Sequence, residues 1–136
     1  MPKPPLTDEI KTILAQPLAA VMASLRPDGS PLSVPTWYLL EDDGRILINM
    51  DDRRVRLEHV RQDPRVALTV LGESWYQHIS LRGRIDEFKP DTDFADIDRL
   101  SKHYGGKAYP NRSRPRISAL IEIDYWHGWG SLKSAD

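Results

Sequence analysis

The stretch WYQHISLRGRIDEF, residues 75–88, alternates between apolar and polar side chains over most of its length. One face is apolar and carries Ile79, Leu81 and Ile85. The opposite face is polar and carries His78, Ser80, Arg82, Arg84 and Asp86. Because successive side chains of a β-strand point to opposite faces, this period of two predicts a long strand with one buried face.

Shorter strand patterns, separated by turn sequences, flank this segment on both sides. They are expected at residues 18–25, 31–40, 45–50, 65–71 and 117–124. Turn-forming runs such as Arg26-Pro27-Asp28-Gly29 and Glu41-Asp42-Asp43-Gly44 connect consecutive strands closely. Such short connections favour antiparallel pairing. The chain is therefore expected to be mainly β, with six strands in a closed or partly closed antiparallel barrel.

A few short helices are expected beside the strands. Thr7 is the expected N-cap of a helix that ends before Pro17, because two acidic residues and an apolar stripe follow it. Further helices are expected at residues 51–62 and 91–104. The Gly105-Gly106-Lys107 run fits a helix C-cap better than a phosphate loop, since it lacks the other residues of that motif.

The composition fits one small domain spanning residues 1–136, with a leader and helix over 1–17 and a tail over 126–136. Hydrophobic residues make up 40% of the chain, the net charge is −1 and cysteine is absent. The missing cysteines exclude disulfides, thiolate metal sites and cysteine nucleophiles. The charge balance argues against a nucleic-acid partner. No apolar run is long enough for a signal peptide or a bilayer, so a cytoplasmic protein without a membrane partner is expected.

The run Asp51-Asp52-Arg53-Arg54-Val55-Arg56 is the most informative polar segment. It places three arginines at the junction of a strand and a helix, beside backbone N–H groups of the helix start. Guanidinium groups and free N–H groups both donate to phosphate oxygens, so the run suits a phosphate site. The alternative is a solvated basic face. The two aspartates compete for the same donors, or they act as caps that orient the arginines.

The histidines and tryptophans allow more than one interpretation. The four histidines have no metal-ligand spacing, and only His78, on the polar face of the long strand, is kept as a functional candidate. The four tryptophans are typical of core or interface anchors, although a flat cofactor would also need large rings. Trp126 and Trp129 in the tail are expected to cover a barrel end or to reach a partner subunit.

The order of several segments resembles the pyridoxamine-phosphate-oxidase-like superfamily of flavin and deazaflavin oxidoreductases, in its F-420-dependent split β-barrel branch. The segments that carry the resemblance are Arg26–Pro31, Val34–Tyr38, Arg54–Val66, the Gly83-Arg84 pair and His127–Gly130. The sequence departs from the family pattern at two places. Arg56 stands where relatives commonly have lysine, and His59 stands where they have asparagine.

The resemblance implies a six-stranded split antiparallel β-barrel that forms a homodimer, with cofactor sites in grooves between the subunits. Phosphate would lie against Arg54 and Arg56, and Arg53 would add charge for an acidic tail. The implied cofactor-binding residues are Val34, Pro35, Thr36, Asn49, Met50, Arg53, Arg54, Val55, Arg56, Gln77 and His78. Of these, Gln77 and His78 would come from the partner subunit and close the groove.

The resemblance further implies an F-420-dependent oxidoreductase that reduces a small electron-poor molecule of the enone, quinone or tetrapyrrole type. Two alternatives stay open, namely an FMN-dependent oxidoreductase of the same fold and a non-enzymatic carrier of deazaflavin, flavin or haem. In either enzyme the cofactor carries the chemistry, so no obligatory catalytic side chain is expected. His78 or Tyr76 is a candidate proton donor to the product.

Overall fold

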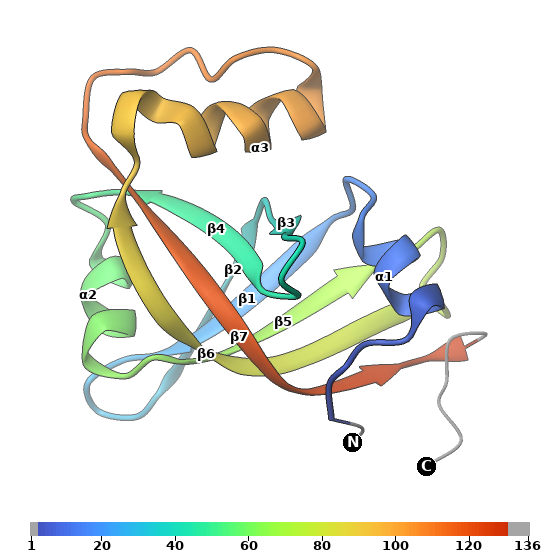
Figure 1. Cartoon of the computed structure of the whole chain (residues 1–136). Coiled ribbons are helices and arrows are strands. Elements are labelled where there is room, and N and C mark those ends of the chain that lie inside the picture. The colour runs from blue at the N-terminus through green and yellow to red at the C-terminus, as the bar shows by residue number, and fades with distance from the viewer. Residues whose placement is uncertain (1–2, 131–136) are drawn as a thin grey trace.

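The computed structural model describes residues 3–130, which form one curled, seven-stranded sheet with three α-helices around it (Figure 1). The strands are β1 (Ala20–Leu25), β2 (Pro31–Thr36), β3 (Leu39–Leu40), β4 (Ile46–Asp51), β5 (Arg65–Leu71), β6 (His78–Pro90) and β7 (Arg116–Gly128). The helices are α1 (Asp8–Leu14), α2 (Val55–Gln62) and α3 (Ala95–Gly105), with a 3-10 turn, η1, at Thr92–Phe94. The strand order is β2-β1-β5-β6-β7-β4-β3, and every neighbouring pair is antiparallel.

The mainly β, antiparallel fold class is confirmed, but the strand count of six is wrong. The segment expected as one strand at 31–40 is divided at Trp37 and Tyr38. Its first part pairs with β1 and its second part pairs with β4, at the other edge of the sheet. Pro31 and Pro35 lack a backbone N–H, which explains why β2 lies at a sheet edge. β2 and β3 are therefore the two edge strands of the curled sheet. Among residues 3–130 they do not pair with each other, so the barrel is not closed.

The helix starts differ from the predicted ones for local reasons. Helix α2 begins at Val55 rather than at Asp51, because Asp51 ends β4 and its carboxylate accepts a hydrogen bond from the Arg53 N–H at 2.9 Å. Asp51 therefore caps the turn, as one of the two interpretations of this run expected. Thr7 is confirmed as the N-cap of α1, since its hydroxyl accepts from the Ile10 N–H. Gly106 ends α3 in the left-handed conformation that favours glycine.

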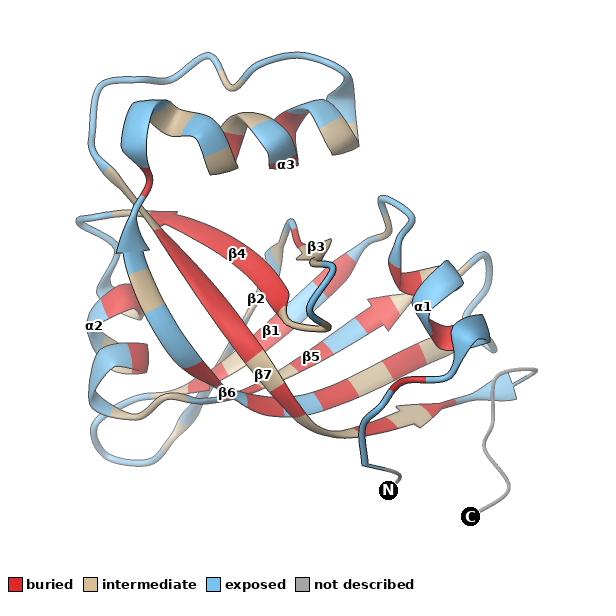
Figure 2. Cartoon of the chain, in the orientation of Figure 1, coloured by how far each residue is buried: buried red, intermediate tan, exposed pale blue. Residues whose placement is uncertain are grey.

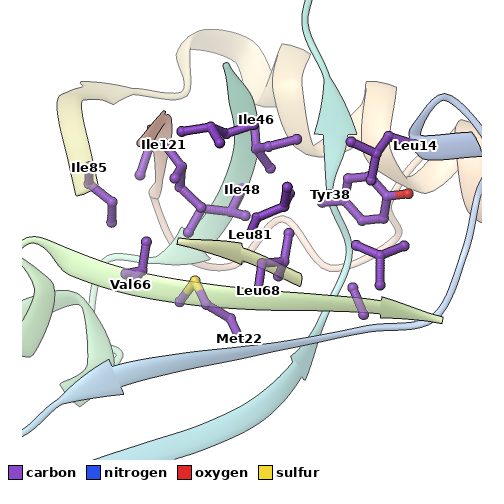
Figure 3. Packing of buried hydrophobic residues seen from close by; sticks show 14 of the residues in the cluster. Leu14, Met22, Tyr38, Ile46, Ile48, Val66, Leu68, Leu81, Ile85 and Ile121 are labelled. Carbon is purple, nitrogen blue, oxygen red and sulfur yellow. The ribbon is translucent and has the colours of Figure 1, made fainter. Parts of the chain in front are cut away.

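The hydrophobic core fills the concave side of the curled sheet. The predicted faces of the long strand are confirmed, because Ile79, Leu81 and Ile85 are buried and their polar neighbours are not (Figure 2). Residues from the other strands and α1 meet them in one cluster (Figure 3), which includes Leu14, Met22, Tyr38, Ile46, Ile48, Val66, Leu68 and Ile121. Trp126 belongs to the same cluster, so it is a core residue of β7 rather than a cover at a barrel end.

A second, smaller cluster forms on the convex side, where α3 covers β4 and β7. Leu47 and Leu120 of the two strands pack against Ile97 and Leu100 of the helix. This layer explains why residues 46–50 are buried without alternation, since both faces of β4 are covered. The side chains of Leu47 in β4 and Leu120 in β7 therefore face α3 rather than the barrel interior.

Gly83 permits the close approach of β6 and β7. The register of the pair shifts between Arg82 and Gly83, and a Cβ at position 83 would overlap the Glu122 carbonyl group. We expect Gly83→Ala to lower the free energy of unfolding by about 1–3 kcal/mol, because the strands would have to separate locally. Gly105→Ala is the control in chemical denaturation, since its added methyl group meets no atom within 4 Å and it should not destabilise the chain. Equal stability of the two variants would contradict the tight packing at position 83.

Candidate functional site

A cavity of about 630 Å³ lies where α3, α2 and the β1–β2 edge of the sheet meet. This volume is typical of small-molecule sites. The residues that line it are Pro17, Leu18, Ala19, Ala20, Pro35, Thr36, Trp37, Asn49, Arg56, Ile97, Leu100, Tyr104, Tyr109 and Arg116. Two of these are arginines and none is acidic, so the cavity has a positive charge.

The segment between β6 and β7 builds one wall of this cavity. Figure 1 shows α3 lying across β4 and the beginning of β7. Asp91 fixes the start of this helix, because its carboxylate accepts hydrogen bonds from the N–H groups of Asp96 at 2.7 Å and Ile97 at 2.9 Å. With Ile97 and Leu100 packed on the sheet, the helix has a defined position over the site.

Three aromatic rings form the apolar part of that wall. Trp37 stacks on Tyr104 with ring centroids 5.4 Å apart, and Tyr109 contacts Trp37 edge-on at 6.2 Å. The Tyr104 hydroxyl donates to the Leu18 carbonyl at 2.7 Å, which ties α3 to the chain segment before β1. Burial raises the pKa of Tyr104 to about 12, so this hydroxyl stays protonated at neutral pH. Trp37 remains 38% exposed, which leaves ring surface accessible.

Asn49 is the centre of the polar part of the cavity. Its side-chain Nδ2 donates to Asp91 at 3.0 Å and to the Ser118 hydroxyl at 3.2 Å, and its Oδ1 accepts from Arg116 Nε at 2.6 Å. The strand register explains why the Asn49 and Ser118 side chains are in contact, because the two residues are register partners on the α3 side of β4 and β7. The network holds the Asn49 amide and the Arg116 guanidinium in fixed orientations.

Arg56 brings a half-buried charge to the cavity without a carboxylate to neutralise it. Its Nε is buried and has no hydrogen-bond partner among the described residues. Burial, and then the neighbouring Arg54 guanidinium, lower the pKa of Arg56. His59, three residues further along α2, also has a buried Nδ1 without a partner. An anionic ligand group in the cavity would pair with the Arg56 guanidinium and favour its charged form.

The structure brings four of the predicted cofactor residues together in this cavity, namely Pro35, Thr36, Asn49 and Arg56. Two others lie beside it in β2 and β4. The Val34 side chain is half-buried on the same side of its strand as Thr36, and it does not line the cavity. The Met50 side chain is buried in the barrel core, so only its backbone could face a ligand.

The remaining predicted residues lie outside the cavity. Arg53, Arg54 and Val55 are exposed, and Arg54 Nε lies 3.7 Å from the Asp51 carboxylate. Gln77 and His78, in the turn before β6 and at its start, do not line the cavity. They lie at the opposite end of β6 from Pro90, which pairs with Ile117. Across the sheet, His78 pairs with Leu71 of β5, whose N–H donates to the Ala19 carbonyl at the β1 end of the cavity.

Several lining residues were not among the predicted ones, notably Leu100, Tyr104, Tyr109 and Arg116. They come from α3, the loop after it and the beginning of β7. Their only local signal is that Tyr104 and Tyr109 lie on either side of the Gly105-Gly106 stop and Arg116 follows the loop. Their approach to Asn49 depends on how a 25-residue connection folds back over the sheet, which local patterns do not encode.

Residues 3–130 contain no group of three or more histidine, aspartate or glutamate side chains placed to hold a metal ion. None of the helices in this part of the chain has the length and the apolar composition needed to cross a bilayer.

Comparison with known proteins gives a family and a fold. A family model described as pyridoxamine 5'-phosphate oxidase matches residues 6–130. No curated protein matches the chain. A solved structure described as an F-420 reductase is 21% identical, with a TM-score of 0.81, and the match covers 89% of this chain and 98% of that one.

Two more solved structures have the same fold. The conserved hypothetical protein Rv2991 from Mycobacterium tuberculosis is 19% identical, with a TM-score of 0.70 over 94% of this chain and 86% of that one. HupZ from Group A Streptococcus is 15% identical, with a TM-score of 0.68 over 97% of this chain and 100% of that one. At these identities the similarity to solved structures shows the fold alone.

Proposed function

We propose that this chain, which belongs to the pyridoxamine 5'-phosphate oxidase family of flavin-type oxidoreductases, uses bound coenzyme F-420 to reduce a small electron-poor molecule. The acceptor is of the enone, quinone or tetrapyrrole type. The observation that carries the proposal is the half-buried Arg56, without a carboxylate partner, in a cavity that has no acidic lining residue. The similarity in fold to an F-420 reductase supports the choice of cofactor.

The lining residues fit a flat cofactor that carries a phosphate. Arg56 would bind the phosphate, because a guanidinium donates two parallel hydrogen bonds to its oxygens. Pro35 and Thr36 would contact the ring system, and Trp37 with Tyr104 would exclude water from it. The cofactor, when bound, supplies the hydride, and the protein supplies binding, orientation and a dry environment.

The first test is a titration of the purified protein with F-420 and with FMN, followed by fluorescence. Tighter binding of F-420, together with F-420-dependent reduction of a quinone, is the expected result. A yellow protein that retains FMN through purification would favour the FMN alternative, which the flavin-type family also supports. Failure of both cofactors to bind would refute the proposed function.

We also propose a homodimer in which Gln77 and His78 of the partner subunit close the cavity. The proposal rests on the exposed aromatic turn at Trp75 and Tyr76, which directly precedes these two residues. Trp75 is 80% exposed and Tyr76 76% exposed, and such large aromatic surface is typical of interfaces. Light scattering at micromolar concentration should give twice the chain mass of 15.6 kDa. A monomeric mass would contradict a cavity that is closed by residues of the partner subunit.

A further inference from the structure

We propose that Arg116 binds the carboxylate of the electron acceptor, so that the acceptors of this protein are planar conjugated carboxylic acids. The inference rests on the proposed function and names its substrate class. It is carried by a guanidinium that the protein orients toward the cavity and leaves without an anion.

The pairing of the other arginines shows how unusual Arg116 is. Carboxylates pair closely with Arg45, Arg65, Arg84, Arg99 and Arg112. Within residues 3–130, the arginines that have no carboxylate within 4 Å are exposed, apart from Arg56 and Arg116. These two half-buried arginines line the same cavity. The unpaired positive charge is therefore concentrated in the cavity and is not part of a general basic surface.

The surroundings of Arg116 fix its orientation. Its Nε donates to Asn49 Oδ1 at 2.6 Å, and the guanidinium lies over the Tyr109 ring, 4.9 Å from the centroid. Neither Nη1 nor Nη2 has a hydrogen-bond partner in the described chain. The terminal edge of the fork is therefore free to donate two parallel hydrogen bonds to one carboxylate.

The carboxylates near Arg116 are already occupied by other donors. Asp91 accepts from the start of α3 and from Asn49. Asp96 accepts from the Ser118 hydroxyl at 2.7 Å and from Arg99 at 3.1 Å. Asp51, which lines a small neighbouring cavity with Arg116, accepts from the Arg53 N–H and lies within 4 Å of Arg54 and Arg114. An anion for Arg116 must therefore come from outside this network.

The aromatic wall indicates what kind of molecule carries the carboxylate. Trp37, Tyr104 and Tyr109 line the cavity together with Arg116, which lies over the Tyr109 ring. Arg56 belongs to α2 and is the proposed phosphate ligand of the cofactor. A conjugated ring against the aromatic wall would place its carboxylate at Arg116. The acidic tail of F-420 is the other source of a carboxylate, and the experiment separates the two.

The experiment measures the binding of an anthraquinone carboxylate and of the matching carboxamide by isothermal titration calorimetry. The protein is used without cofactor, with saturating oxidised FMN, which has no carboxylate, and with oxidised F-420. The unmodified protein should bind the carboxylate at least about tenfold more tightly than the amide, the scale expected of a charge-assisted pair. Arg116→Gln should abolish that preference, and Arg116→Lys should retain part of it.

The control is Arg26→Gln, which removes an exposed arginine from the β1–β2 turn and should leave the preference unchanged. Equal affinity of the unmodified protein for the acid and the amide would overturn the inference. A loss of F-420 or FMN affinity in Arg116→Gln, with the acid preference intact, would also overturn it by assigning Arg116 to the cofactor. Failure of both cofactors to bind, with the acid preference present, would instead refute the proposed function alone.

Discussion

Trp126→Ala is expected to lower the free energy of unfolding by about 3–5 kcal/mol, the range seen when a large core aromatic is truncated. Trp126 is 5% exposed, lies in β7 opposite Leu81 of β6, and packs within the main core cluster. Alanine would leave a cavity that the two long strands cannot close without giving up their pairing. Chemical denaturation followed by circular dichroism measures the change.

Trp75→Ala is the matched control, because it removes the same side chain from a position that is 80% exposed. Measured at protein concentrations low enough to dissociate the proposed dimer, its effect should stay within about 0.5 kcal/mol. Trp126→Phe should be milder than Trp126→Ala, since it keeps a ring and removes the indole Nε1, which is buried without a partner. A loss below about 1 kcal/mol in Trp126→Ala would show that residue 126 belongs to a peripheral tail.

The sequence predicted that residues from 126 onward form a tail that stabilises the protein, and the structure corrects its boundary. Residues 126–128 are the last part of β7, and Gly128 pairs with Ile79. The predicted role of Trp129 at a barrel end or interface remains a prediction. Its ring stacks on His78 with centroids 6.1 Å apart, beside the exposed aromatic turn. The alternating pattern ended at Asp124, so the local signal stopped before the strand did.

Most of the fold follows from local patterns in the sequence. Alternation identified the long β6 strand, and proline, glycine and aspartate identified the turns after β1 and β3. The division of residues 31–40 was not predictable in the same way. Trp37 and Tyr38 have side chains typical of strands, but Tyr38 is buried in the main core while Trp37 joins the α3 wall. This separation depends on contacts with distant residues.

The site was less predictable because helix phase and strand parity decide which residues face it. The basic run contains three arginines, and the sequence alone does not show which of them faces the cavity. Since α2 begins at Val55, Arg56 points into the cavity while Arg54 remains exposed next to Asp51. Similarly, Asn49 and Met50 are neighbours in β4 with side chains on opposite faces. The family resemblance implied both residues as cofactor ligands, whereas the structure places only the Asn49 side chain in the cavity.

Arg56→Ala is expected to weaken the binding of F-420 or FMN by about one to two orders of magnitude. A hydrogen bond to a charged group contributes roughly 1.5–3 kcal/mol, and 1.4 kcal/mol corresponds to a factor of ten. The Arg56 guanidinium is half-buried with an unpartnered Nε, so bound phosphate would give it a pair that the free protein lacks. Arg56→Lys should be milder, because lysine keeps the charge without the fork.

Arg54→Ala is the matched comparison, and its effect should be only a few-fold. The sequence predicted equal contributions from the two arginines, but Arg54 is exposed and lies 3.7 Å from the Asp51 carboxylate, where solvent screens its charge. Riboflavin, which lacks the phosphate, should bind the unmodified protein and Arg56→Ala equally. A similar loss for riboflavin and FMN would mean that Arg56 shapes the cavity rather than binding phosphate. Unchanged affinity for FMN and F-420 in both alanine variants, with folding confirmed, would remove the phosphate site from α2 altogether.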